Sequence, residues 1–235
     1  MGDSLGDRIK SNYENRARHQ LTRRTPVIIR VDGKAFHTLT AKCEKPFDLN
    51  LIDIMAGAAQ DVSGQIQGFK MGYVQSDEAS FLLTDFEDIS TDAWFDYGLQ
   101  KMASVTASMM TLFFNRRLAA LWESPLKNGI ALFDARCFNI PMEEVSNYFL
   151  WRAKDWERNS LQMVARANYS AKELHGKKRA DLHELLHQKG INWNDLHPQL
   201  KNGTFLFQGK VKRKFDIEPV YDQIQDALFQ AMEKK

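Results

Sequence analysis

The stretch Pro26-Val27-Ile28-Ile29-Arg30-Val31-Asp32-Gly33 decides the fold of this 235-residue chain. Its β-branched centre predicts a buried strand, and proline is tolerated at the first position of a strand. The strand runs directly into Asp32-Gly33. A carboxylate at such a point is either a turn residue or a ligand for a cation. Because Asp-Gly is also a frequent turn dipeptide, these two residues alone leave both interpretations open.

A second carboxylate lies at the end of another predicted strand. Residues 69–75 and 79–83 have strand character, and the short polar link Ser76-Asp77-Glu78 joins them. Mg²⁺ prefers oxygen ligands and usually takes one or two protein carboxylates together with substrate phosphates. Asp32 and Asp77 could supply the carboxylates. Successive strand residues point to opposite faces, so Asp77 and Glu78 are not expected to face one ion.

Helices are predicted between and after these strands. Asp48 is a candidate N-cap for a helix that reaches Val62, and Gly190 is expected to close a shorter helix. The other predicted elements are helices at 92–122, 143–170, 182–188 and 219–235, a strand at 130–140, and a hairpin of 204–207 with 211–215. This order favours an α/β or α+β fold with a partly antiparallel sheet over regular βαβ repeats.

Composition places the chain among globular proteins, because 43% of its residues are hydrophobic and 26% are charged. No stretch is apolar enough to cross a membrane, and the polar N-terminus has no secretory h-region. Cys43 and Cys137 leave at most one disulfide open, so a reducing, cytoplasmic location is expected. Residues 151–235 hold 16 Lys/Arg against 11 Asp/Glu, whereas residues 1–150 hold 16 against 19. A basic C-terminal third suits a polyanionic partner.

Several motifs occur together along the chain. They are R-V-D-G-K-A-F-H at 30–37, K-P-F-D at 45–48, Q-S-D-E-A-S-F at 75–81, Lys101, F-D-A-R at 133–136, Y-F-L-W-R at 148–152 and L-K-N-G-T at 200–204. In this order they resemble the tRNA-His guanylyltransferase family, and in particular its prokaryotic-type members, which polymerise RNA in the 3′→5′ direction. The resemblance covers about residues 30–204.

The resemblance implies a polymerase- and cyclase-like palm with a mainly antiparallel sheet in residues 1–140. Residues 141–235 would form a helical, basic, RNA-facing region packed on the palm, in one compact unit. Asp32 and Asp77 would be the catalytic carboxylates, and with the Gly33 carbonyl they would hold two Mg²⁺ ions. The predicted nucleotide-binding residues are Gly33, Lys34, Ala35, Phe36, His37, Lys45, Ser76, Glu78 and Lys101.

Within that set, the backbone from Gly33 to His37 would wrap a nucleoside triphosphate, with Phe36 or His37 near its base or ribose. Lys45, Ser76 and Lys101 would contact a second triphosphate, which activates the RNA end. By resemblance, ATP or GTP first activates a 5′-monophosphate. The 3′-hydroxyl of an incoming nucleotide then attacks that phosphate, and the carboxylates act through the metals. The family also implies a homo-oligomer, a tetramer.

tRNA is the expected partner of the basic region. Its predicted RNA-binding residues are Arg136, Arg158, Asn159, Arg166, Lys172, Lys177, Lys178 and Arg179. Residues 157–163 read E-R-N-S-L-Q-M where eukaryotic members have H-I-N-N-L-Y-N. This departure favours template-directed repair of 5′-truncated tRNA over obligatory recognition of tRNA-His, the guanylyltransferase reaction proper being the alternative.

Three other interpretations remain at this point. A palm-type nucleotide cyclase would use the same metals on free nucleotides but has no use for a basic face. An RNA-binding protein with a degenerate palm would not need Asp32, Gly33 and Asp77 intact. H-E-L-L-H at 183–187 matches the zinc metalloprotease motif, but Trp193 stands where the extended pattern has a third histidine. The leucines beside these histidines form an ordinary amphipathic stripe, which favours a solvated or RNA-facing helix.

Overall fold

The structure, a computed structural model, describes residues 4–121, 129–208 and 219–233. Its centre is a five-stranded sheet in the order β4-β1-β3-β2-β5, and every neighbouring pair is antiparallel. The strands are β1 (Val27–Gly33), β2 (Phe69–Gln75), β3 (Glu78–Leu83), β4 (Phe133–Asn139) and β5 (Thr204–Phe207). The expected mixed fold with a mainly antiparallel sheet is confirmed.

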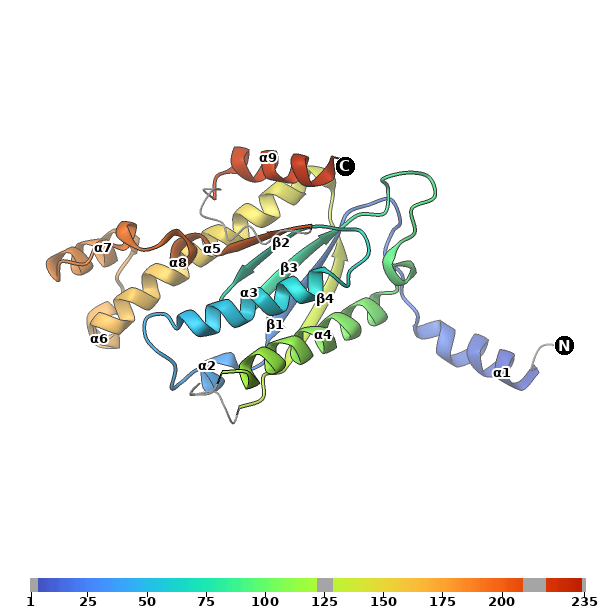
Figure 1. Ribbon diagram of the computed structural model, residues 1–235, viewed down its shortest axis with the longest axis horizontal. Helices are drawn as coiled ribbons and strands as arrows, with labels where there is room; N and C mark the ends of the chain where they lie inside the picture. The colour runs from blue at the N-terminus through green and yellow to red at the C-terminus, as the bar shows by residue number, and fades with distance from the viewer. Residues whose placement is uncertain (1–3, 122–128, 209–218, 234–235) are drawn as a thin grey trace.

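Two pairs of long helices enclose this sheet (Figure 1). α3 (Leu49–Ser63) and α4 (Leu99–Ala119) cover one face, and α5 (Met142–Asn168) and α9 (Tyr221–Met232) cover the other. The shorter helices are α1 (Ser4–Ile9), η1 (Lys10–Glu14), η2 (Asn15–Ala17), α2 (Phe36–Leu39), η3 (Trp94–Tyr97), α6 (Ala171–Leu174), α7 (Arg179–Gln188), η4 (Trp193–Asp195) and α8 (Pro198–Asn202).

The alternation of β1 explains how the sheet is buried. Val27, Ile29 and Val31 belong to the core under α3 and α4, whereas Ile28 belongs to the core under α5 and α9. All four are fully buried, and each such side chain contributes about 1.5–3 kcal/mol through burial. Since alternate strand residues share a face, Arg30 and Asp32 lie on the same side of the sheet as Ile28, the side that α5 covers.

The predicted elements are present with some changes at their ends. Asp48 caps α3 by accepting a hydrogen bond from the Leu51 N–H at 3.1 Å, as predicted. The long helix begins at Leu99 and not at residue 92, because Phe95 and Asp96 have positive φ angles within the turn η3. Residues 92–98 therefore form an irregular connection.

The other helix and strand limits shift by a few residues. The strand expected at 130–140 is β4, the helix expected at 143–170 is α5, and the helix expected at 182–188 is α7, which begins at Arg179. The helix expected to reach residue 122 ends at Ala119, and the strand expected at 211–215 lies outside the described residues.

The region beyond residue 140 contributes to the sheet as well as covering it. β5 pairs with β2 at the sheet edge, and the far end of α5 packs against α7 and Trp193 in a third apolar cluster.

Cys43 and Cys137 are buried free thiols, and burial raises the pKa of Cys137 to about 12. Within the described ranges, no helix is both long and apolar enough to span a membrane.

Candidate active site

The ends of β1 and of the β2–β3 hairpin meet at one edge of the sheet. Asp32 lies opposite Glu78 in the pairing of β1 with β3. The Gly33 N–H donates a hydrogen bond to the Asp77 carbonyl oxygen at 3.1 Å, which holds the hairpin turn against the end of β1. The structure therefore brings together the three predicted metal-binding residues, Asp32, Gly33 and Asp77, from segments more than 40 residues apart in the sequence.

Glycine is required at position 33 by the packing of the loop that follows. A Cβ atom there would lie 2.2 Å from Cδ2 of Phe36. The Phe36 ring packs against Phe114 and Phe133, with centroid distances of 5.4 and 5.2 Å, and is only 6% exposed. The Phe36 ring therefore anchors the loop from the core. That Phe36 or His37 lies near a base or ribose stays a prediction, and His37 is the exposed one of the two.

The Asp77 carboxylate is held at the tip of the hairpin. The Ser76 hydroxyl donates a hydrogen bond to Asp77 Oδ1 at 2.9 Å, and Ser76 has a φ of 50°. Burial raises the pKa of Asp77, and the negative charge of Asp32 raises it further, while the Ser76 bond and His37 oppose this shift. A non-glycine residue at positive φ is a strained conformation, of the kind that concentrates at functional sites.

These groups suit a divalent cation. A positive ion would relieve the mutual repulsion of Asp32 and Asp77, and the two carboxylates with the Gly33 carbonyl are the hard oxygen ligands that Mg²⁺ prefers. Among the described residues, no group of three or more His, Cys, Asp or Glu side chains could hold a metal. Two carboxylates completed by water and phosphate oxygens are what Mg²⁺ usually takes.

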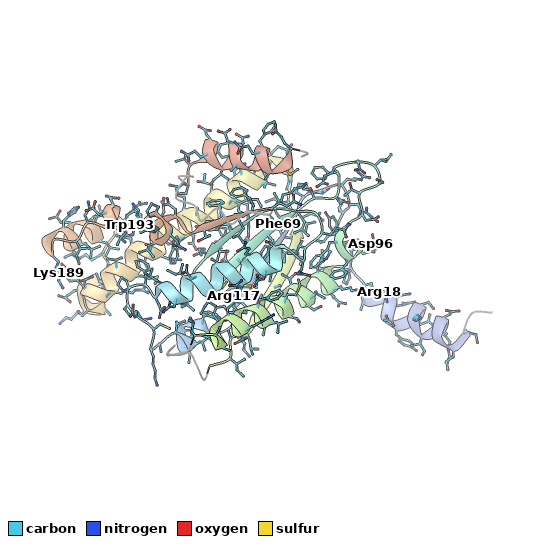
Figure 2. All side chains as sticks on the ribbon, viewed as in Figure 1. Arg18, Phe69, Asp96, Arg117, Lys189 and Trp193 are labelled. Carbon is cyan, nitrogen blue, oxygen red and sulfur yellow. The ribbon has the colours of Figure 1, made fainter. Side chains whose placement is uncertain are left out.

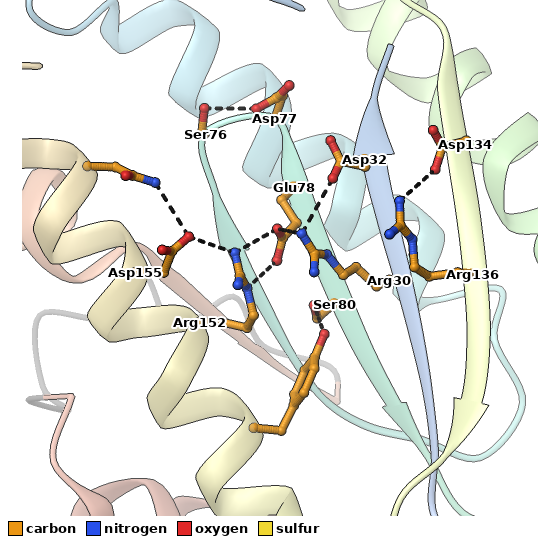
Figure 3. Close-up of polar contacts among 12 residues, drawn as sticks. Arg30, Asp32, Ser76, Asp77, Glu78, Ser80, Asp134, Arg136, Arg152 and Asp155 are labelled. Atoms are coloured by element: carbon orange, nitrogen blue, oxygen red, sulfur yellow. Dashed lines mark hydrogen bonds and ion pairs between the residues drawn. The ribbon is translucent and has the colours of Figure 1, made fainter.

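A row of charged side chains lies behind these carboxylates on the α5 side of the sheet (Figure 3). Arg30 Nη2 lies 3.5 Å from Asp32 Oδ2 and 2.6 Å from Glu78 Oε2. Arg152, on α5, donates from Nε and Nη2 to the two Glu78 oxygens at 2.7 and 2.9 Å. Asp77 and Glu78 point in different directions, as the strand alternation predicted.

Glu78 is 5% exposed, and both of its carboxylate oxygens accept hydrogen bonds from Arg152. Burial raises the pKa of Glu78, and the charges of Arg152 and Arg30 oppose that shift. Its predicted contact with a nucleotide stays a prediction. In the structure, Glu78 contacts arginines behind the site.

The other predicted nucleotide-binding residues are spread more widely. Lys34 and Ala35 lie in the loop after β1, where Ala35 has a φ of 52°, and Lys45 is exposed on the following loop. Lys101 lies in the first turn of α4, with its ammonium 4.6 Å from the centre of the Phe95 ring.

Lys101 is remote from the Gly33 loop within one chain. Phe114, which contacts Phe36, is 13 residues further along α4. At 1.5 Å per residue this separation is about 20 Å, so the structure does not bring Lys101 to Lys45 and Ser76.

The predicted RNA-binding residues fall into two places. Arg136 is exposed on β4 and pairs with Asp134 at 3.5 Å. The others lie on the distal half of α5 and the segments after it: Arg158, Asn159, Arg166, Lys172, Lys177, Lys178 and Arg179. Arg158 is 64% exposed and pairs with Asp155, and Arg179 lies 4.0 Å from Glu157, which places the start of α7 beside α5.

The histidines of the H-E-L-L-H motif lie at this same distal end (Figure 2 labels Trp193 and Lys189 there). The His183 ring packs edge-on against Trp193 with centroids 5.9 Å apart. Burial lowers the pKa of His183, and Arg179 and His187 lower it further. The residue at the third-ligand position of a zinc protease is thus an apolar packing partner of the first histidine.

Arg30 and Arg152 were missed as site residues by sequence reasoning. For Arg30 a signal existed, because a residue two positions before Asp32 on a strand shares its face. Arg152 belongs to the motif at 148–152, but nothing in the sequence indicated its partner, since its contact with Glu78 joins residues 74 positions apart and depends on how α5 lies across the sheet.

Comparisons with known proteins decide the family. The tRNAHis guanylyltransferase family model matches residues 6–141. This chain belongs to that family. A tRNA(His) guanylyltransferase of Debaryomyces hansenii is 30% identical over 90% of this chain and 82% of its own length. Guanylyltransferases are nucleotidyltransferases, so the expected enzyme class is confirmed.

Two solved structures share the fold of this guanylyltransferase-family chain over nearly its whole length. One is a bacterial tRNA(His) guanylyltransferase-like protein in complex with ATP, with a TM-score of 0.86, 40% identity, and coverage of 94% of this chain and 99% of its own. The other is a bacterial protein of the same description in complex with GTP, with a TM-score of 0.79, 36% identity, and coverage of 98% and 99%.

Proposed function

We propose that this chain is a Mg²⁺-dependent 3′→5′ nucleotidyltransferase that repairs 5′-truncated tRNA, with the added base chosen by a template nucleotide. The observation that carries the proposal is the junction at the sheet edge, where the Gly33–Asp77 hydrogen bond joins the ends that bear Asp32 and Asp77. The likeness to ATP- and GTP-bound bacterial structures supports nucleoside triphosphates as substrates. We further propose a cytoplasmic homo-oligomer.

The residues at the junction divide the work between them. Asp32, Asp77 and the Gly33 carbonyl would hold the ions, and Mg²⁺, when bound, supplies positive charge that stabilises a phosphoryl-transfer transition state. Ser76 fixes the Asp77 carboxylate through its hydroxyl. The loop after Gly33, anchored by Phe36, would receive a triphosphate, with His37 exposed toward it. Lys45 would add a positive charge for a second triphosphate.

The packing of residues 157–163 favours repair over obligatory tRNA-His recognition. Glu157 is 9% exposed and Leu161 is 2% exposed. The Ser160 hydroxyl donates to the Leu200 carbonyl at 2.7 Å and accepts from the Trp193 indole at 3.0 Å. Glu157, Ser160 and Leu161 thus support α8 and Trp193, and Arg158 is the one exposed residue of this stretch, so it offers little with which to read an anticodon.

The guanylyltransferase reaction proper is the second candidate function. It is favoured by the names of the curated relatives, several of which are described as tRNA(His) guanylyltransferases. Under this alternative the added base is always G and the tRNA is always tRNA-His.

Incorporation of labelled nucleotide into a 5′-truncated tRNA tests the proposal. We expect incorporation that requires Mg²⁺ and a triphosphate for activation, with several tRNAs accepted as substrates. Activity confined to full-length tRNA-His would favour the second candidate. A chain that converts free nucleotides into cyclic products and leaves RNA unextended would be a cyclase.

A further inference from the structure

Four charged side chains of alternating sign connect the candidate metal site to helix α5. They are, in order, Asp32, Arg30, Glu78 and Arg152 (Figure 3). Arg152 and Glu78 are nearly inaccessible to solvent, with side chains 5% and 7% exposed. The proposed chemistry gives no role to Arg152.

The fold places these four groups in one line for identifiable reasons. In the β1–β3 pairing, Asp32 lies opposite Glu78, and Arg30, two residues before Asp32 on β1, lies opposite Ser80. The hydroxyls of Ser80 and Tyr148 lie 2.8 Å apart, which fixes α5 over β3. Arg152 follows Tyr148 by four residues, one helical turn, so it lies over Glu78, the residue two positions before Ser80 on the same strand face.

Arg30 is shared unequally between two carboxylates. Its Nη2 is 2.6 Å from Glu78 but 3.5 Å from Asp32. Arg152 already satisfies both oxygens of Glu78, so Glu78 needs only one contact from Arg30. Without Arg152, a buried carboxylate would be left to Arg30 alone, and the low dielectric around it would draw the guanidinium fully onto Glu78. Asp32 would then lose the positive group beside it.

A contribution to folding stability does not explain why Glu78 and Arg152 are buried as charged groups. Buried ion pairs often contribute little or nothing relative to apolar side chains of similar volume. The row instead ends on a predicted metal ligand, and hydrogen-bonded partners behind a ligand typically hold it in the orientation that binds the metal.

We propose that Arg152 is a positioning residue for the metal site, which acts through Glu78 and Arg30 to hold the Asp32 carboxylate for a divalent cation. The inference rests on the proposed function only in taking Asp32 as a ligand of that cation. The row continues from Arg152 to Asp155, at 2.9 Å, and from there to the exposed Arg158.

Binding of Mn²⁺ to the full chain without RNA, followed by electron paramagnetic resonance, tests this role apart from catalysis. Arg152→Met should weaken Mn²⁺ binding by about tenfold or more, as for partners behind a metal ligand. Arg152→Lys should recover part of the loss, because it keeps the charge but not the paired contact. Lys154→Met is the matched control. It removes a positive charge from the same helix, and Lys154 pairs with Glu157, outside the row. It should leave the affinity unchanged.

A double-mutant cycle separates positioning from a merely structural effect. If Arg152 acts through Glu78, Arg152→Met should change Mn²⁺ affinity by no more than about twofold in a Glu78→Gln background. The double variant also removes both buried charges together, so it and Arg152→Lys carry the test should the single variant unfold. A tenfold loss in the Glu78→Gln background overturns the proposal, as does unchanged affinity in a folded Arg152→Met chain.

Asp32→Asn distinguishes failure of this inference from failure of the proposed function. Loss of Mn²⁺ binding in Asp32→Asn without loss in Arg152→Met overturns the positioning role and leaves the metal site intact. Retained Mn²⁺ binding in Asp32→Asn overturns the metal assignment, and the positioning role with it.

Discussion

Charged side chains are held very differently at the strand-end site and at the distal end of α5. Around Asp32 and Glu78 they are buried or half-buried and cross-linked between strands and helix, and paired hydrogen bonds fix Arg152 on Glu78. Around Arg158 and Arg166 they are exposed and contact side chains three or four residues away on the same helix. The first arrangement suits a cation that needs defined geometry, whereas the second suits a phosphate backbone that needs only positive charge.

The strand-end site should therefore be intolerant of substitution. Asp32→Ala and Asp77→Ala should each lower nucleotide addition by more than about a hundredfold, because loss of a carboxylate removes charge that compensates the ions. Labelled-nucleotide incorporation under saturating Mg²⁺ measures the effect. Asp134→Ala is the matched control, since Asp134 lies opposite Asp32 on β4 but is exposed. Near-normal turnover in either site variant would contradict the assignment.

The activation step should show a smaller and selective effect. Lys45→Ala and Ser76→Ala should reduce addition to 5′-monophosphate RNA about tenfold more than addition to the same RNA with a 5′-triphosphate. A triphosphate end needs no activation. Lys42→Ala, which removes an exposed charge from the same loop, serves as the control.

Lys101→Ala tests whether Lys101 belongs to the same activation site as Lys45. The family resemblance groups Lys101 with Lys45, whereas the structure places Lys101 about 20 Å along α4 from Phe114, which contacts Phe36 in the loop after Gly33. From the position in a single chain, we expect Lys101→Ala to show no preference between the two RNA ends. Selective loss on the monophosphate end would show that Lys101 reaches the activation site from elsewhere. If Lys45→Ala lowered addition equally on the monophosphate and the triphosphate RNA, Lys45 would have no specific role in the activation step.

Substitutions at the distal end of α5 should change the affinity for tRNA and leave the rate at saturating tRNA unchanged. Arg166→Gln and Lys172→Gln should each weaken tRNA binding several-fold and reduce the slope of log affinity against log salt by about 1, with little change at saturating tRNA. A filter-binding titration over a range of salt concentrations measures both quantities. Lys10→Gln, on the exposed N-terminal helix η1, is the control. A change in kcat without a change in salt slope would place these residues in the chemical step.

The smallest effect is expected at the H-E-L-L-H motif. His183→Ala and Glu184→Gln should leave metal content and nucleotide addition largely unchanged, apart from a minor effect on RNA affinity. The His183→Ala variant loses the ring contact with Trp193, which is a packing contact. Metal analysis of the purified variants is the measurement. One equivalent of tightly bound zinc that disappears in His183→Ala would restore the metalloprotease interpretation.

The sequence predicted those parts of the site that follow from local rules. Asp32 and Asp77 could be placed because each ends a strand, and Asp48 because a capping residue precedes an apolar helix. The start of α4 could not be placed, because the turn at Phe95 and Asp96 depends on a distant contact, the hydrogen bond from Gln20 to Asp96 at 2.5 Å. Tertiary packing also decided that Phe36 belongs to the core.

A change of template base separates template-directed repair from guanylyltransferase activity in a single experiment. One 5′-truncated tRNA is prepared with each of the four bases at the nucleotide that faces the vacant 5′ position, and all four nucleoside triphosphates are supplied together. We expect the added base to be the Watson–Crick complement in every case, because phosphate contacts on the basic face carry no base information. Addition of G irrespective of the facing base, or addition confined to tRNA-His, would contradict it.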